Sequence, residues 1–376
     1  MTGNPTRPPA NKLLGLEALR FTASFGIVIW HYQHFAYIAD KPVDLVKHQL
    51  PMYRLLQPFY ETGSCGVWIF WCISGFIFFW KYRETIAGRT ISAWTFMVFR
   101  FSRLYPLQLV TLIVVATLQS AYFRLNGHFF VYQDNDIRHF LLQALMASEW
   151  GLQRGLSFDG PAWSISVEVL VYAAFFVMLR FATKSALLNF VVVVACLNTS
   201  GQVFSCLAFF YAGGLAAIAR REIASATLAT AVEIVAWCGA VSIPLLIWLY
   251  DFPDRMATFG FLLSYTPLAL FCLSSSRFTL SATPQRLVEA AGNMTYSCYL
   301  LHFPIQLAIA LGCAAVGIPI PFYNVWFFAM FVTATLLASH LTFRYFEAPA
   351  QALLRKHLLL EQQLPFRSIG QMQPRA

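Results

Sequence analysis

Long apolar runs recur along the whole chain, and they leave it few possible folds. An α-helix needs about 20 predominantly apolar residues to cross the hydrocarbon core of a bilayer. Ten windows reach or approach that length: 14–36, 66–82, 104–122, 163–182, 186–199, 202–219, 231–250, 256–275, 294–316 and 322–343. The runs are continuous and do not alternate, which favours helices over a transmembrane β-barrel. The sequence therefore predicts an all-α, polytopic membrane bundle of about ten helices, in which Gly201 marks either a tight hairpin or a broken helix.

The composition excludes a soluble globular domain. Hydrophobic residues make up 58% of the 376 residues and charged residues only 11%, whereas about a quarter of a soluble domain is charged. The net charge of +9 does not predict a nucleic-acid partner, because the basic residues fall where membrane topology requires them. The eight cysteines show no spacing typical of a metal site. No metal is predicted, and whether Cys65 and Cys313 pair is left open.

Loop charges predict that both termini lie in the cytoplasm. With the N-terminus inside, the cytoplasmic segments hold about 18 Lys and Arg and the outside loops about 7, as the positive-inside rule requires. No cleavable signal peptide is expected, since residues 1–12 are polar and Pro-rich and the first apolar run is too long for one. We expect a cytoplasmic N-tail over 1–13, a transmembrane domain over 14–347 and a cytoplasmic C-tail over 348–376.

Two ionisable residues lie inside the first apolar run, where such residues are costly and mark a functional site by default. Arg20 and His31 are eleven residues apart, which is about three helical turns, so their side chains leave nearly the same helix face. The offset along the axis is roughly 16 Å. The loop charges place Arg20 nearer the cytoplasm and His31 nearer the outer surface. His34 follows three residues later and is an alternative to His31 in any catalytic role.

Two further segments have both a structural and a functional interpretation. The pair Ser74-Gly75 lies within the second apolar run and either lets another helix approach closely or borders a substrate channel. Arg100 and Arg103 share a helix face before the third run, and they are either topology anchors or a phosphate clamp. Pro106 suits the first turn of that third helix.

The later runs carry polar residues at membrane depth. Glu168 is followed by eleven residues without a charge, so it lies inside the membrane boundary and needs a partner or a proton. Ser164 precedes it by one helical turn on the same face, and Trp163 lies at the mouth of that helix. His302 is expected a few residues into the membrane from the inner face. Glu347 follows the last run.

Taken in order, these residues resemble the membrane-bound acyltransferase family 3. Glu17 departs mildly from the family pattern, since members often carry Asp at that position. Each element is weak alone, but the ordered set is specific and covers nearly the whole chain. The elements are R-x₁₀-H as Arg20 and His31, S-G-F within Phe70 to Phe76, R-x-x-R-x-x-P as Arg100 to Pro106, W-S-x-x-x-E as Trp163 to Glu168, Y-x-x-H-x-P as Tyr299 to Pro304, and E-x-P as Glu347 to Pro349.

The resemblance implies an integral membrane enzyme that moves an acyl group from cytoplasmic acyl-CoA, with acetyl-CoA as the default donor, to a hydroxyl group of a glycan. His31 is the expected general base or acyl carrier, and Glu168 is expected to orient it. The expected donor contacts are Arg20, Arg100, Arg103, Ser74 and Gly75. The expected substrate-binding or supporting residues are Trp163, Ser164, His302 and Glu347.

The resemblance leaves the acceptor open. An exopolysaccharide or O-antigen sugar is expected, in the inner membrane of a bacterium and in association with the lipid bilayer and possible polysaccharide assembly proteins. Acylation of a macrolide or another small glycosylated metabolite is an alternative. Intramembrane Arg, His and Glu also suit an ion-coupled transporter, but no paired halves with matching broken helices are present. A structural subunit of an assembly complex would not explain the buried charges.

Overall fold

The computed structural model describes residues 13–182, 185–197, 199–223, 227–238, 255–274 and 280–360. Contacts divide the chain into two compact units, each assembled from separate stretches of sequence. The first unit contains 1–27, 62–81 and 185–295, and the second contains 28–61, 82–184 and 296–376. Helices α1 (Leu14–Tyr32) and α3 (Gly66–Ala87) contribute to both units, so the units are not consecutive domains.

The described residues are mostly helical. Their strands are β1 (Tyr37–Ile38) and β2 (Lys41–Pro42), a short antiparallel pair in which Ile38 lies opposite Lys41. Six helical segments are long and apolar enough to cross a membrane: Tyr53–Ala87, Ala93–Asn126, Gly160–Phe181, Gln202–Glu222, Thr295–Ala315 and Val325–Leu359. Shorter apolar helices cover Ala186–Leu197, Thr227–Cys238 and Thr258–Leu273. The all-α membrane architecture is confirmed, whereas the number of ten spans and the cytoplasmic termini stay predictions. Residues 239–250 of the predicted window 231–250 lie outside the described residues.

Close contacts at glycines organise the first unit. Its helices α7 (Ala186–Leu197) and α8 (Gln202–Glu222) pack against each other after a turn at Gly201, whose φ of +121° favours glycine. Of the two alternatives for this segment, the hairpin is therefore correct. Helix α8 also packs against α10 (Arg255–Leu273) and, through backbone contacts, against α3. Helix α11 (Ala282–Asn293) and the helix Thr227–Cys238 also belong to this unit.

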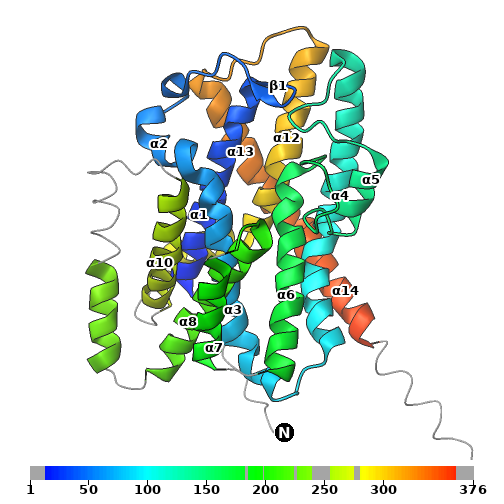
Figure 1. Ribbon diagram of the computed structural model, residues 1–376. Coiled ribbons are helices and arrows are strands. Elements are labelled where there is room, and N and C mark those ends of the chain that lie inside the picture. The colour runs from blue at the N-terminus through cyan, green and yellow to red at the C-terminus, as the bar shows by residue number, and fades with distance from the viewer. Residues whose placement is uncertain are drawn as a thin grey trace, which may run out of the picture. The chain divides into compact units, whose positions relative to one another are not determined.

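The second unit is built mainly from helices. They are α2 (Tyr53–Thr62), α4 (Ala93–Asn126), α5 (Ile137–Ala144), α6 (Trp163–Phe181), α12 (Thr295–Ala315), α13 (Val325–Thr342) and α14 (Ala348–Leu360). Short 3₁₀ turns cover Gln33–Ala36, Lys47–Gln49 and Gly160–Ala162, and a further one, Gly63–Cys65, belongs to the first unit. Helix α4 lies beside α6 and α14, and α5 packs against α4 (Figure 1).

Helix α4 starts earlier than the sequence predicts. Ser92 caps it by accepting the backbone N–H of Thr95 at 3.0 Å, and a glycine in the left-handed region ends it at position 127. Arg100, Arg103 and Pro106 therefore lie inside the helix. The prediction that Pro106 occupies the first turn is wrong, because the capping residue lies well upstream of the apolar run.

The last transmembrane helix does not end the bundle. Helix α13 continues through a π-helical turn, Phe343–Glu347, into α14. Helix α14 packs along α4, where Trp94 Nε1 donates to the backbone oxygen of Leu358 at 3.2 Å. Part of the segment expected as a cytoplasmic tail is thus a packed helix of the second unit.

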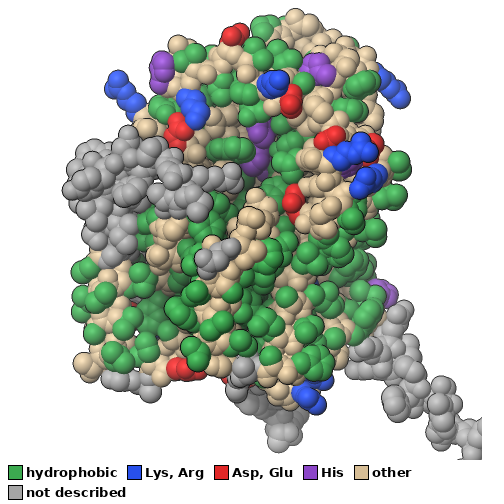
Figure 2. Space-filling model, viewed as in Figure 1, with side chains coloured by type: hydrophobic (Ala, Val, Ile, Leu, Met, Phe, Trp, Pro, Cys, Tyr) green, Lys and Arg blue, Asp and Glu red, His purple; other side chains and the backbone are tan. Residues whose placement is uncertain are grey.

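The outer surfaces of the long helices suit lipid. Exposed hydrophobic side chains on α4 and α6 include Ile113, Val114, Val177 and Phe181. Figure 2 shows hydrophobic side chains along α6, with charged side chains gathered around the loops at its upper end. Such a surface fits hydrocarbon along the helices and water or headgroups at their ends.

Candidate active site

Three histidines meet at the end of α1. The ring of His31 lies 4.5 Å from the ring of His302 on α12 and 5.0 Å from the ring of His34, measured between centroids. All three side chains are buried. The sequence placed His31 and His302 toward opposite membrane surfaces, and that interpretation is wrong. The structure instead assembles one imidazole cluster from residues 271 positions apart in the chain.

Buried side chains donate hydrogen bonds to the carbonyl groups at the end of α1. The last carbonyls of a helix have no partner within it. Gln306 Nε2 donates to the backbone oxygen of His31 at 2.9 Å, and Gln33 Nε2 donates to the backbone oxygens of Trp30, 3.1 Å away, and Tyr60, 2.8 Å away. These contacts fix the backbone that carries the cluster and tie α1 to α12.

The ring of His302 carries a hydrogen-bond acceptor atom. Its Nδ1 lies 3.2 Å from the backbone oxygen of Cys298. Because a carbonyl oxygen only accepts, Nδ1 carries the proton, and Nε2 of the neutral ring holds a lone pair. His302 Nε2 and His34 Nδ1 are both buried without a hydrogen-bond partner in the described part of the chain. Buried polar atoms rarely stay so, which makes this cluster suited to bind the polar group of another molecule.

Ser164, a predicted supporting residue, positions a tyrosine beside the cluster. The hydroxyl of Tyr299 donates to the backbone oxygen of Pro161, so in its 2.8 Å contact with Ser164 Oγ the serine is the donor. The Tyr299 ring centroid lies 6.1 Å from that of His302. Trp163, half-buried, begins α6 immediately before Ser164.

The two predicted carboxylates each accept a hydrogen bond from a hydroxyl group. Tyr172 donates to Glu168 Oε2 one turn along α6, and Ser297 on α12 donates to Glu347 Oε2 at 2.5 Å. Glu347 thereby connects the π-helical turn to α12. The pairing of Glu168 with His31 stays a prediction.

Three arginines gather on α4 and α14. Arg100 is buried, and its Nη2 donates to the hydroxyl of Tyr82 at 2.7 Å. Arg355 Nε donates to Ser102 Oγ at 3.2 Å. The charges of Arg100, Arg103 and Arg355 are close enough to interact. Like charges repel, so an anion bound between the three guanidinium groups would stabilise this arrangement. The sequence missed Arg355 because it belongs to no motif and falls in the expected tail.

Arg20 belongs to the first unit and already has partners there. Its Nη1 pairs with Glu17 Oε2 at 3.0 Å, and its Nη2 donates to Thr295 Oγ1 at 3.0 Å. A Cβ on Gly292 would lie 1.9 Å from Glu17 Oε2, so glycine at that position makes room for the ion pair. The donor contact predicted for Arg20 stays a prediction.

The Ser74-Gly75 pair is a site of close helix packing. A Cβ on Gly75 would lie 1.8 Å from the backbone oxygen of Phe210 on α8, and a Cβ on Gly213 would lie 1.9 Å from that of Cys72. The helix backbones therefore touch, as the structural interpretation of this pair requires. Ser74 is half-buried, and its predicted contact with a donor stays a prediction.

Tyr132, whose ring centroid lies 6.0 Å from that of His34, and Gln306, which binds the His31 carbonyl, belong to no sequence motif. The buried Asp159 was given no role by the sequence. Asp159 is a charged residue directly before an apolar run, which is a signal that was available. The other two are ordinary residues whose importance comes from the fold. Within the described ranges, no group of three His, Cys, Asp or Glu is arranged to hold a metal ion.

The chain is similar in sequence to known acyltransferases. A family profile described as an acyltransferase domain matches residues 13–344. A similar curated protein is acyltransferase MdmB of Streptomyces mycarofaciens, which is 26% identical over 177 residues. That match covers 47% of this chain and 42% of the relative, so the chain matches less than half of that protein's length. No solved structure matches the chain.

Proposed function

The chain belongs to the acyltransferase-3 family of acyl-transferring enzymes, and from this premise we propose that it acylates a hydroxyl group of a glycan with acyl-CoA as donor. The observation that carries the proposal is the buried imidazole cluster of His31, His34 and His302. Acyl transfer to a hydroxyl needs a base at the attacking oxygen, and imidazole is the side chain most often used. Family membership also removes the transporter and the structural subunit as alternatives.

The proposed chemistry is a direct transfer. His31 takes the proton of the acceptor hydroxyl while the oxygen attacks the thioester carbonyl. An ester C–O bond forms, the C–S bond breaks, and the thiolate of CoA leaves and takes up a proton. His302, whose ring contacts that of His31 and whose Nε2 holds a lone pair, accepts a hydrogen bond from the acceptor, and Glu168 orients His31. A transient acyl group on His31 is the variant of this scheme that the sequence left open.

The arginines of α4 and α14 are the proposed donor site. CoA carries several phosphate charges, and guanidinium matches phosphate geometry with paired hydrogen bonds. Arg100, Arg103 and Arg355 supply three such groups from two packed helices. The proposal places them at the cytoplasmic side, because the loop charges predict that side for residues 81–103. Acetyl-CoA is the default donor.

The proposed acceptor is a sugar hydroxyl of an exopolysaccharide or O-antigen in the inner membrane of a bacterium. The support is chemical: the cluster offers several buried hydrogen-bonding atoms in an aromatic setting, as polar ligands with many hydroxyls require. A small glycosylated metabolite is the alternative acceptor. A panel of acceptors separates the two.

The experiment uses purified protein in lipid nanodiscs with ¹⁴C-acetyl-CoA and a panel of methyl glycosides and macrolides. We expect label on a glycoside, at least a hundredfold loss of kcat in His31→Ala, and a raised acceptor KM in His302→Ala. His48→Ala is the matched control, since His48 is exposed and lies outside the cluster. Full transfer by His31→Ala would refute the assignment of the base.

A further inference from the structure

Asp159 is a buried carboxyl group to which the mechanism above gives no role. Only 1% of its surface is exposed, and neither oxygen has a hydrogen-bond partner in the described part of the chain. The hydroxyl of Thr111 lies beside it but donates its proton to the backbone oxygen of Gln108, 3.1 Å away. A buried carboxyl group without a donor is costly, so its presence needs an explanation.

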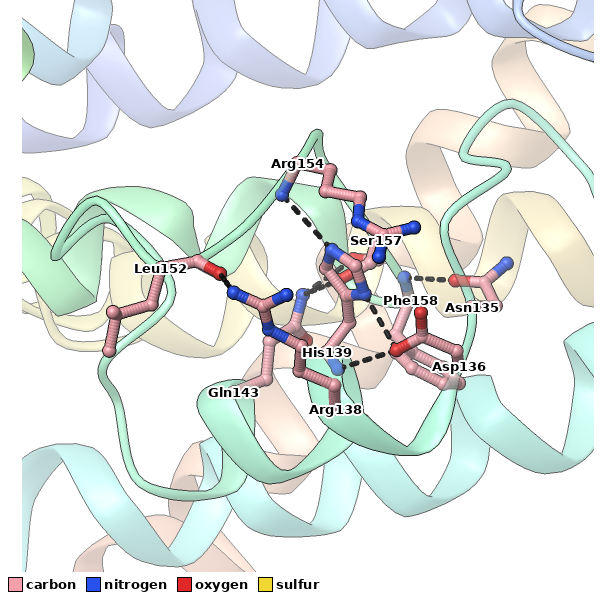
Figure 3. A network of polar contacts seen from close by, with 9 residues as sticks. All are labelled: Asn135, Asp136, Arg138, His139, Gln143, Leu152, Arg154, Ser157 and Phe158. Carbon is pink, nitrogen blue, oxygen red and sulfur yellow. Dashed lines mark hydrogen bonds and ion pairs between the residues drawn. The ribbon is translucent and has the colours of Figure 1, made fainter.

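The backbone before Asp159 is strained and held in place. Phe158 has a φ of +40°, which is unfavourable for a bulky residue. Its N–H donates to Oδ1 of Asn135, and Gln143 Nε2 donates to the backbone oxygen of Ser157 (Figure 3). Such strain persists only where the surroundings enforce it, and it is concentrated at functional sites.

The same loop is anchored a second time at α5. The backbone N–H of Arg154 donates to His139 Nε2 at 3.2 Å, so in the neutral ring His139 Nδ1 carries the proton that it donates to Asp136 Oδ1 at 2.7 Å (Figure 3). Asp136 also caps α5 through the N–H of His139, and these hydrogen bonds hold the pKa of Asp136 below its usual range. The loop from α5 to Asp159 is therefore preorganised.

Two tyrosines connect Asp159 with the histidines. The ring of Tyr132 covers Gly160, where a Cβ would lie 2.2 Å from its Cζ, and its centroid lies 6.0 Å from that of His34. Tyr299, which contacts His302, also lies within electrostatic reach of Asp159. Burial and the charge of Asp159 raise the pKa of Tyr132. Asp159 therefore belongs to the same polar cluster as the imidazoles.

We propose that Asp159 binds hydroxyl groups of the acceptor and thereby presents a neighbouring hydroxyl to the histidines. This inference rests on the proposed function for the identity of the acceptor as a polyol. A carboxylate accepts several hydrogen bonds and can hold two adjacent hydroxyl groups at once. The rings of Tyr132 and Tyr299 supply aromatic surface for the C–H face of a sugar. Asp159 is thus a binding residue that sets acceptor specificity, distinct from the base.

The test compares Asp159→Asn with the wild type in nanodiscs. Methyl glycosides of glucose, mannose and rhamnose serve as the probes. Two readouts are measured: acceptor KM and kcat with acetyl-CoA, and the rise in Tm that each glycoside causes without acetyl-CoA. Asp40→Asn is the control, since Asp40 is exposed and lies on the hairpin turn. Asp159→Ala provides a second variant, and gel filtration checks that all variants fold.

We expect Asp159→Asn to raise the acceptor KM at least tenfold and to remove stabilisation by glycosides, while Asp40→Asn changes neither. A lower kcat at unchanged KM would mean that Asp159 orients a histidine, which would overturn the inference. Glycoside stabilisation equal in the variant and the wild type, or absent in both, would also overturn it. Asp159-dependent stabilisation without any transfer would leave the inference standing and refute the proposed function.

Discussion

Replacing Asp159 by asparagine should change how the stability of the protein depends on pH. Burial raises the pKa of Asp159 from an ordinary 3.8 to about 7. Between these values the folded protein keeps a proton that the unfolded chain has lost. The stability contributed by that proton is fully present below about pH 4 and is lost as the pH rises through about 7. Asparagine does not ionise, so the variant lacks this loss.

The size of the effect follows from the two pKa values. Each pH unit between them corresponds to about 1.4 kcal/mol, so the ionised carboxylate costs up to about 4 kcal/mol of folding free energy. The phenols of Tyr132, Tyr296 and Tyr299 lie within electrostatic reach of Asp159, and phenols ordinarily titrate near pH 10. These phenols therefore do not titrate between pH 4 and 8, and the imidazoles of the cluster, which ordinarily do, are present in both proteins.

The assay is the Tm of both proteins in detergent across that pH range. The variant should gain several degrees relative to the wild type between pH 5 and pH 8, while the two differ little at pH 4. The difference in Tm between the variant and the wild type does not contain the contribution of groups that titrate alike in both proteins. A difference in Tm that does not change with pH would refute the reasoning, because it would show that the carboxyl group is solvated or paired.

Three further predictions test the packing, the helix end and the donor site. Gly75→Ala places a Cβ 1.8 Å from a backbone oxygen and should lower Tm and the yield of folded protein. In the control variant Gly260→Ala the new Cβ meets nothing within 4 Å, and the folding stability should rise by up to about 1 kcal/mol. Equal Tm values for the two variants would contradict the close packing at Gly75. Gln306→Leu removes the side-chain donor to the backbone oxygen of His31, which should cost about 1–3 kcal/mol in denaturant unfolding and lower kcat. An unchanged kcat would show that this contact does not support the site. Arg355→Ala should raise the KM for acetyl-CoA about tenfold, and exposed Lys356→Ala should not; equal KM values would remove Arg355 from the donor site.

The sequence predicted the residues of the imidazole cluster but not that their rings lie in contact. Depth was assigned to His302 by counting from an assumed inner end of its helix. The structure starts α12 beside the middle of α1, where Ser24 Oγ donates to the backbone oxygen of Thr295 at 3.3 Å. Seven residues farther along both helices, His31 and His302 are in ring contact. A hydropathy window gives the length of a span, but the level at which it begins depends on tertiary packing.

Residues outside the motifs show a different limit. Arg355 follows the last apolar run, and only the π-helical turn at Phe343–Glu347 redirects the chain so that α14 packs on α4. Asp159 was visible as a charge before an apolar run, yet its burial depends on a loop held by hydrogen bonds to Asn135 and Gln143. Such loop contacts have no periodicity, so sequence patterns do not reveal them.

Helix α4 links the two ends of the proposed reaction. Arg100, in the arginine group, and Thr111, beside Asp159, are eleven residues apart on it, so they share a face and are separated by roughly 16 Å along the axis. The same spacing drew attention to Arg20 and His31, but α4 lies entirely within the second unit, together with the imidazole cluster. The extended pantetheine arm of CoA separates its thioester from its phosphates by a length of this order. A donor held at Arg100 can therefore present its acyl group near Asp159 without any requirement on Arg20.

On this reasoning Arg20→Ala acts through the loss of its contacts with Glu17 and Thr295. The variant should have a lower Tm and a nearly unchanged KM for acetyl-CoA. A raised KM for acetyl-CoA at an unchanged Tm would instead place the donor site at α1.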